Sequence, residues 1–86
     1  MSAERVTEIR RRLEAAFEPR ILEIEDQSHM HVGHAGAASG GGHFAVCIEA
    51  TALAGVSRVK QHRMIYRALG EMMGTEIHAL SIEVTK

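Results

Sequence analysis

Histidine is the residue whose number and spacing in this sequence most favour chemistry. The chain of 86 residues carries six histidines, and His29, His31 and His34 fall close together. Neutral imidazole is the commonest side-chain ligand of metals and suits zinc and iron alike. Cys47 is the only cysteine, so no Cys-x-x-Cys pair can complete a tetrahedral zinc site. The cluster therefore suits a metal that takes its remaining ligands from a partner, although each histidine taken singly can equally be a solvated loop residue.

Two amphipathic helices are expected in the sequence, one before and one after the histidine-rich segment. Apolar residues recur at steps of three and four over 6–17 and again over 65–73, which is the period of a helix with one buried face. Pro19 biases the residue before it away from helical geometry and ends the first helix. Ser57 is a candidate N-cap of the second helix, and Gly74 is expected to be the left-handed residue at its end.

Three short segments alternate apolar and polar residues and predict strands. They are residues 22–25, 44–49 and 79–84. Residues 26–42 lack any period and are rich in Ser, His, Gly and Ala, which predicts a long loop. The order helix, strand, strand, helix, strand indicates one domain over residues 1–86.

The connection between the last two strands is expected to gather the histidines. A helix joins these strands, so if both belong to one sheet they run parallel, through a right-handed crossover. Parallel strands begin at the same end of a sheet, and His43 and His78 stand where the two strands begin. The loop histidines lead directly into His43, so five of the six histidines are expected at one end. His62 belongs to the start of the second helix, at the other end.

The alternation also predicts which face of the sheet is buried. One face should pack on both helices, and the other should be largely exposed, with Glu23, Cys47, Glu49 and Ser81 on it. A slip of one residue in register would move Cys47 into the core. The predicted core comprises Leu22, Ile24, Phe44, Val46, Ile48, Leu80, Ile82 and Val84 from the strands, and Ile9, Leu13, Phe17, Ile65, Leu69 and Met72 from the helices.

Charge and composition exclude several classes of protein. Ten Lys and Arg against eleven Asp and Glu give a net charge of -1, unlike the strongly basic footprint of a dedicated nucleic-acid binder. No apolar run approaches the ~20 residues of a membrane span. A single cysteine and an N-terminus without a signal-peptide core favour a cytoplasmic location. The triplet Arg10, Arg11 and Arg12 is expected on a solvated helix face.

Four segments of the chain resemble the BolA family. They are Asp26-Gln27-Ser28 with a following loop histidine, His43-Phe44, the run from Val59 to Tyr66, and the run from Ile77 to Leu80. The match covers essentially the whole chain in order and departs from the family at Gln61, where arginine is usual. The resemblance implies an α+β fold of the class II KH-like type, αββαβ, with a three-stranded mixed sheet covered on one face by two helices.

The resemblance also implies a partner and a cofactor. A BolA-like adaptor binds a monothiol glutaredoxin of the Cys-Gly-Phe-Ser type and shares a two-iron, two-sulfur (2Fe-2S) cluster with it and with glutathione, in cluster trafficking or in iron or redox sensing. His78 and His31 are the implied metal ligands, with His29 and His34 as alternates. Histidine ligation raises the cluster potential and makes binding acid-labile. The isolated chain is expected to hold no cofactor and to be a monomer or weak homodimer.

Other interpretations remain open. His78 can instead be a half-buried residue that bonds to backbone at the start of a strand. Members of the family have also been regarded as nucleic-acid-binding transcriptional regulators of stress response and cell morphology. Here that interpretation rests on Arg58, Lys60, Arg63 and Arg67, which lie near the start of the second helix, where the helix dipole favours phosphate.

Catalysis is not expected of this chain. Cys47 could be imagined as a nucleophile activated by a histidine. However, it lies in the middle of a strand, with no helix start to lower its pKa and no third group to orient a base.

Overall fold

The domain is a three-stranded sheet with two helices, in the order αββαβ. A computed structural model describes residues 2–27 and 42–85. Its elements are α1 (Ser2–Phe17), β1 (Ile21–Asp26), β2 (Gly42–Glu49), the 3-10 turn η2 (Thr51–Leu53), α3 (Arg58–Leu69), the 3-10 turn η3 (Gly70–Met72) and β3 (Ile77–Val84). The strand order is β1-β2-β3, with β1 antiparallel and β3 parallel to β2. This arrangement confirms the predicted α+β fold.

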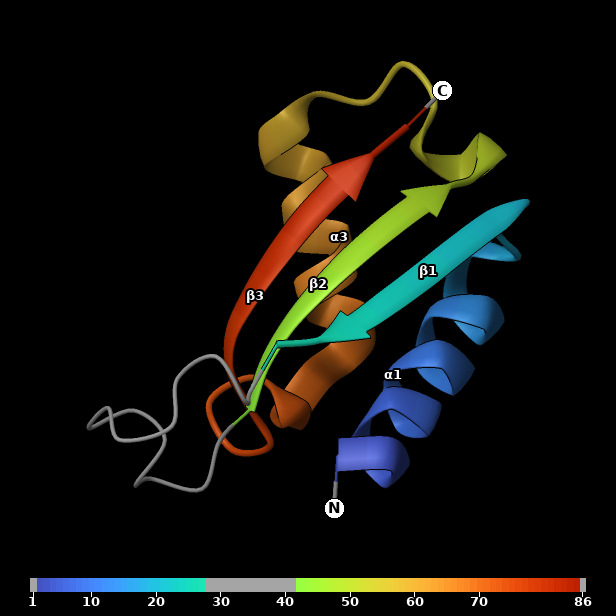
Figure 1. Cartoon of the computed structure of the whole chain (residues 1–86). Coiled ribbons are helices and arrows are strands. Elements are labelled where there is room, and N and C mark those ends of the chain that lie inside the picture. Colours follow the sequence, from blue (N-terminus) through green and yellow to red (C-terminus); the bar gives the residue numbers. More distant parts are fainter. Residues whose placement is uncertain (1, 28–41, 86) are drawn as a thin grey trace.

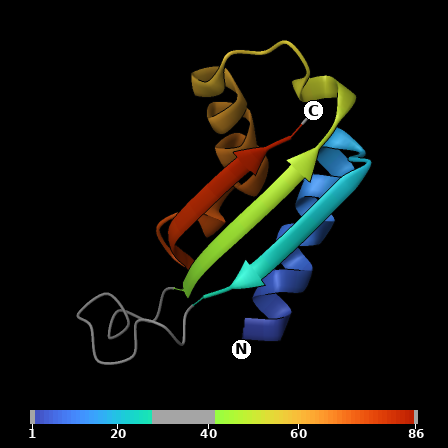
Figure 2. The same ribbon diagram turned by 45° about the horizontal axis from the view of Figure 1, so that its top comes forward.

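Both helices lie on the same face of the sheet. Figure 1 shows α1 and α3 behind the three strands, running in opposite directions. The turned view in Figure 2 keeps both helices on that side. The other face of the sheet is not covered by any described element, so the domain has two layers.

The core lies between this sheet face and the two helices. Alternation along the central strand β2 buries Phe44, Val46 and Ile48, and the side chains of both helices meet them at helical spacing. The other buried apolar residues are Ile9, Leu13 and Phe17 from α1, Ile65 and Leu69 from α3, and Ala50, Leu53, Met72 and Ile77. Every buried side chain among the described residues is apolar.

The predicted strand register is confirmed, with one difference in exposure. Leu22, Ile24, Leu80, Ile82 and Val84 pack against the core as half-buried residues. On the other face Glu23 and Ser81 are exposed as predicted, whereas Cys47 and Glu49 are half-buried. The reason is that β2 has a neighbouring strand on each side, so the flanking side chains shield its outer face.

The end of α3 differs from the prediction. Ser57 caps the helix as expected, because its hydroxyl accepts a 3.3 Å hydrogen bond from the backbone N–H of Lys60. The helix ends earlier, at Leu69, and Gly70 takes a positive φ of 58°. Gly74 was expected at the helix end and lies instead in the turn before β3, with φ 90°. Glycine at position 70 stops the helix because it tolerates this conformation at no steric cost.

The prediction that Arg10, Arg11 and Arg12 form a solvated face is wrong for Arg12 and incomplete for Arg10, whose side chain is 43% exposed but also contacts β1. Arg10 Nη1 donates a 3.2 Å hydrogen bond to the carbonyl of Leu22 in β1. Arg12 Nη1 donates a 2.6 Å hydrogen bond to the carbonyl of Leu69, the last residue of α3. Only Arg11 keeps a mostly exposed side chain.

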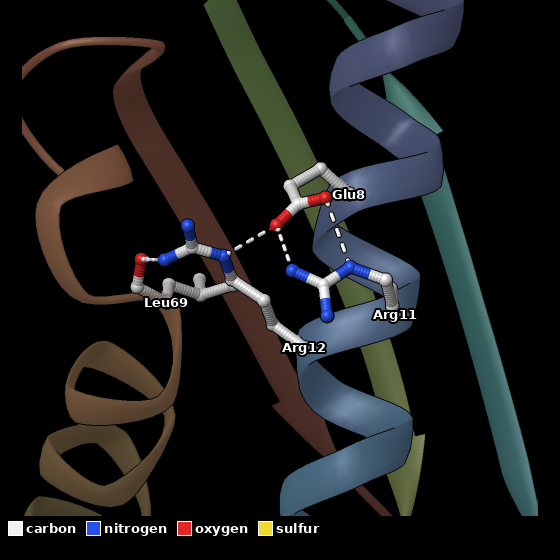
Figure 3. Close-up of polar contacts among 4 residues, drawn as sticks. All are labelled: Glu8, Arg11, Arg12 and Leu69. Carbon is white, nitrogen blue, oxygen red and sulfur yellow. Dashed lines mark hydrogen bonds and ion pairs between the residues drawn. The ribbon is translucent and has the colours of Figure 1, made fainter.

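Glu8 holds Arg12 in place for this contact (Figure 3). Its carboxylate accepts a 2.8 Å bond from Arg12 Nε and two bonds from Arg11. Arg12 thus satisfies a carbonyl that the α3 helix leaves without an intrahelical partner, and it brings a cation to the negative end of the helix dipole. The network ties α1 to the end of α3 that leads into β3.

No helix among residues 2–27 and 42–85 is both long enough and apolar enough to cross a membrane.

The Glu8 network predicts a specific acid response. Hydrogen bonds from Arg11 and then Arg12 lower the pKa of Glu8 from 4.5 to about 2. Because the folded-state pKa is depressed, the stabilisation is complete above pH 4.5 and is lost as pH falls towards 2. Urea denaturation should therefore show Glu8→Gln less stable than the wild type at neutral pH. The difference should shrink below pH 4.5 and vanish near pH 2.

Glu71→Gln, an exposed carboxylate outside this network, is the matched control and should show no such pH-dependent difference. A difference between the wild type and Glu8→Gln that stayed constant from neutral pH down to about pH 2 would contradict the assignment.

Candidate functional site

The candidate site is the end of the sheet where β2 and β3 begin side by side. Gly42 pairs with Ile77 and His43 pairs with Ala79 across the parallel ladder. The backbone N–H of Gly42 also donates a 3.0 Å hydrogen bond to the carbonyl of Glu76. His43 and His78 therefore lie at the same end of the sheet, as the predicted crossover required.

A β-bulge at this end presents His78 to solvent. One step along β2, from Gly42 to His43, is matched by two steps along β3, from Ile77 to Ala79. His78 is thus the extra residue of β3. Its neighbour Ile77 is completely buried, whereas His78 is exposed. Bulges of this kind redirect a side chain and occur preferentially next to functional sites. The alternative of a half-buried structural histidine does not fit this exposure.

The turn before β3 fixes the position of His78. Gly74 donates its backbone N–H to the carbonyl of Ile77 over 2.9 Å, and its φ of 90° is one that glycine adopts freely. Met72, just before this turn, is completely buried. The strand start is therefore held by buried residues on both sides of the turn, and His78 projects from a well-packed segment.

The remaining described histidines divide as the topology predicted. His43 is half-buried, and its carbonyl accepts a 2.7 Å hydrogen bond from the backbone N–H of Gln27. Gln27 and Gly42 flank positions 28–41, so both attachment points of that segment are at this end. The predicted ligands in that segment, His29, His31 and His34, lie outside the described residues.

His62 lies apart from this group, as predicted. It is in the second turn of α3, which begins at the opposite end of the sheet (Figure 1). Its ring meets Tyr66 edge to face, with centroids 6.4 Å apart. This contact spans one helical turn and accounts for the half-buried state of His62.

The described residues offer imidazole ligands but no complete metal site. In the part of the chain that the structure describes, no three His, Cys, Asp or Glu side chains converge well enough to hold a metal ion. An exposed histidine at a packed strand start can supply one ligand, with the rest from elsewhere. Imidazole nitrogen is a donor that iron accepts, so His78 fits the chemistry of an iron ligand.

Cys47 is poorly suited to ligation or catalysis. It is half-buried in the middle of β2. Burial raises the pKa of its thiol, and the carboxylates of Glu83, Glu23 and Glu49 raise it further. A thiolate is the reactive and metal-binding form, so this environment keeps the sulfur in its inert state.

The four cations on which the nucleic-acid interpretation rests are all in α3. They are Arg58, Lys60, Arg63 and Arg67, and all are exposed. Val59 and Tyr66 on the same helix are also exposed, by 62% and 40%. Gln61 turns inward and donates a 2.8 Å hydrogen bond to the carbonyl of Leu53. The side chain at position 61 therefore links the first turns of α3 to η2 and adds no charge to the helix surface.

Known proteins share this fold and sequence. A family model described as BolA-like protein matches residues 13–86. Protein BOLA1, chloroplastic, of Arabidopsis thaliana is 41% identical over 81 residues, which cover 91% of this chain and 51% of that protein. The DNA-binding transcriptional regulator BolA of Escherichia coli (strain K12) is 39% identical over 82 residues, covering 95% of this chain and 72% of that protein.

Solved structures agree with these sequence relationships. The BolA domain of SufE1 from Arabidopsis thaliana matches with a TM-score of 0.81 and 41% identity, covering 94% of this chain and 90% of that one. The chain spans about half of the chloroplastic BOLA1 protein and 21% of SufE-like protein 1, also from Arabidopsis thaliana. What those longer proteins do as a whole therefore does not pass directly to this chain.

The bulge makes opposite predictions for two neighbouring residues. Ile77→Ala should lower the free energy of unfolding by about 2–5 kcal/mol, because it removes a fully buried side chain. His78→Ala should change it by less than about 0.5 kcal/mol, because the side chain is exposed. Chemical denaturation of the two variants checks both values. Comparable destabilisation by both variants would show that His78 packs in the core.

Proposed function

This chain belongs to the BolA-like protein family, and from that membership we propose that it is an adaptor which binds a monothiol glutaredoxin and co-ligates a shared 2Fe-2S cluster. The partner's Cys-Gly-Phe-Ser cysteine and glutathione hold one side of the cluster. This chain supplies imidazole nitrogen to the other side, from His78 and from His31, with His29 and His34 as alternates. The chain acts in cluster trafficking or in iron or redox sensing and is not itself an enzyme.

The observation that carries the proposal is the exposure of His78 at the bulge of β3. Exposed histidines are common on protein surfaces. His78 is unusual because its neighbour Ile77 is fully buried and a bulge in the strand ladder separates the directions of the two side chains. It also lies at the end of the sheet to which the other candidate ligands are attached. A ligand held on a packed strand keeps its geometry when the partner arrives, so little ordering cost opposes binding.

Imidazole ligation has two chemical consequences. Histidine in place of cysteine on one iron raises the reduction potential of such a cluster. The ligands must also be neutral to bind metal, so binding should be weaker in acid than at neutral pH. We also propose that the chain is cytoplasmic, because it has a single free cysteine. In the absence of a partner it is expected to be a monomer or a weak homodimer.

The direct test mixes the purified chain with a monothiol glutaredoxin reconstituted with cluster and glutathione. The wild type should change the visible spectrum of the cluster, and His78→Ala should abolish that change because it removes a ligand whose position is fixed by a packed strand start. His62→Ala and Cys47→Ser are the matched controls and should retain it. If His78→Ala gave the same visible spectrum with the glutaredoxin as the wild type, the shared-cluster proposal would be wrong.

Variants in the segment 28–41 identify the second ligand. His31→Ala should weaken the spectral change, since His29 and His34 can partly substitute for it. Replacing all three histidines should remove the change as completely as His78→Ala does, while circular dichroism shows an intact fold. A triple variant that behaved like the wild type would mean that the second ligand lies outside this segment.

A second candidate function is nucleic-acid binding, as in the transcriptional regulator of Escherichia coli. The observation that favours it is the presence of four exposed cations on α3, of which Lys60, Arg63 and Arg67 share one helix face. The net charge of -1 and the small number of aromatic residues argue against strong binding. It therefore ranks below the cluster proposal.

Charge removal on α3 separates the two functions. Arg58→Gln, Lys60→Gln and Arg63→Gln together should weaken DNA binding and lower its salt slope by about one for each phosphate that is no longer neutralised. Cluster transfer from the glutaredoxin should be unchanged, because these residues are away from His78. Loss of the glutaredoxin complex with DNA binding preserved would reverse the assignment of the two surfaces.

A further inference from the structure

The uncovered face of the sheet is hollowed along its central strand. A depression of about 440 Å³ lies over this face and includes Ala45, Cys47 and Ser81 in its lining. Ala45 and Cys47 come from β2, and both are half-buried although no described element covers them. Small side chains in the centre and longer ones on the flanking strands produce this trough.

The walls of the trough carry charge of a single sign. The strand register places Glu23 of β1 and Glu83 of β3 on either side of Cys47 in one row across the sheet. In the next row Glu25 and Ser81 flank Ala45. None of the three described strands contains a Lys or Arg. The trough is therefore acidic on both sides at one level and on the β1 side at the next.

These carboxylates are not neutralised within the described part of the domain. Glu49 at the far end of the face is ion-paired with Arg20 over 3.3 Å. By contrast, the side chains of Glu23 and Glu83 form no hydrogen bond or ion pair with any described residue. The whole chain has a net charge of only -1. The acidity of this face therefore means that positive and negative side chains are separated, with most of the cations on the helices.

The spacing of the acidic side chains suits an α-helix that lies over the trough. Neighbouring strands are about 4.8 Å apart, so the backbones beneath Glu23 and Glu83 are separated by about 10 Å across β2. A helix with its side chains is about 10–12 Å wide. An extended strand would leave the trough partly empty, and phosphate groups would be repelled by the carboxylates.

We propose that this uncovered sheet face is a docking surface for a basic amphipathic helix of a protein partner. Small or apolar residues of that helix pack on Ala45 and Cys47, and Lys or Arg on its two sides pair with Glu23, Glu25 and Glu83. The helix covers the second face of the sheet as α1 and α3 cover the first. The lining of the trough comes from the middle of the strands and does not include His43 or His78, so the two sites use different residues.

A peptide titration tests the surface directly. The probe is a labelled amphipathic helical peptide of about 18 residues, made of Ala, Leu and Lys and long enough to span the sheet face. The control peptide has Glu in place of every Lys. The basic peptide should bind saturably, with an affinity that falls as salt is raised. Its NMR shift changes should map to Ala45, Cys47 and Ser81. The acidic peptide should not bind.

Matched variants locate the charges. Glu23→Gln with Glu83→Gln should weaken binding of the basic peptide about fivefold to tenfold, the effect of removing two exposed ion pairs. Glu14→Gln with Glu71→Gln removes the same charge from the helix side and should change affinity less than about twofold. Ser81→Arg should block the trough. His78→Ala should bind the peptide like the wild type, so failure of this proposal is distinguishable from failure of the cluster proposal.

Three results would overturn the inference. They are equal binding by the two double-glutamine variants, shift changes confined to α3 or the helix side, and sedimentation showing that a second copy of the chain occupies the face.

Discussion

Parallel strands can be neighbours in a sheet only if the chain returns to its starting end between them. In this domain α3 makes that return between β2 and β3. Because of it, His43 and His78 begin adjacent strands at one end, while His62 and the start of α3 stay at the other. The Glu8–Arg12–Leu69 network depends on the same constraint, since α1 can cap the end of α3 only where α3 comes back to the histidine end.

The bulge in β3 determines what the histidine end can do. In a regular strand His78 would lie on the same face as Leu80 and Ile82 and point into the core. The extra residue moves it out and lets Ile77 turn in. One local irregularity therefore gives a core residue and an exposed imidazole from adjacent positions, without disturbing the face of the strand beyond it.

Periodicity in the sequence was sufficient to predict the elements, the buried face and the grouping of His43 with His78, because alternation and connection rules act locally. Periodicity did not predict the features that depend on tertiary contacts, namely the end of α3 and the contacts of the arginines in α1. Gly70 rather than Gly74 ends α3, and Arg12 reaches the Leu69 carbonyl there from another helix. Arg10 is drawn to β1 in the same way. The sequence does contain a signal of the bulge, but it lies partly outside the alternating segment 79–84 from which the strand was predicted. Ile77 and Leu80 are three residues apart, so they cannot both face the helices from a regular strand, and such a break in parity indicates an inserted residue.

The charges of the domain are also arranged by its two layers. Exposed arginines and a lysine line α3, and glutamates line the opposite sheet face. This separation gives a small, nearly neutral domain one basic surface, one acidic surface and a histidine-bearing end. Such an arrangement is consistent with the proposed adaptor role, because each surface can select a partner of different charge.

The central claim is that imidazole nitrogen of this chain ligates a cluster shared with a glutaredoxin. Pulsed EPR of the reduced complex tests it most directly, with ¹⁵N-histidine incorporated only into this chain. The account predicts ¹⁵N couplings of directly bonded imidazole to the cluster, and loss of the His78 coupling in His78→Ala. Absence of ¹⁵N coupling in the wild-type complex, or couplings unchanged in His78→Ala, would contradict it.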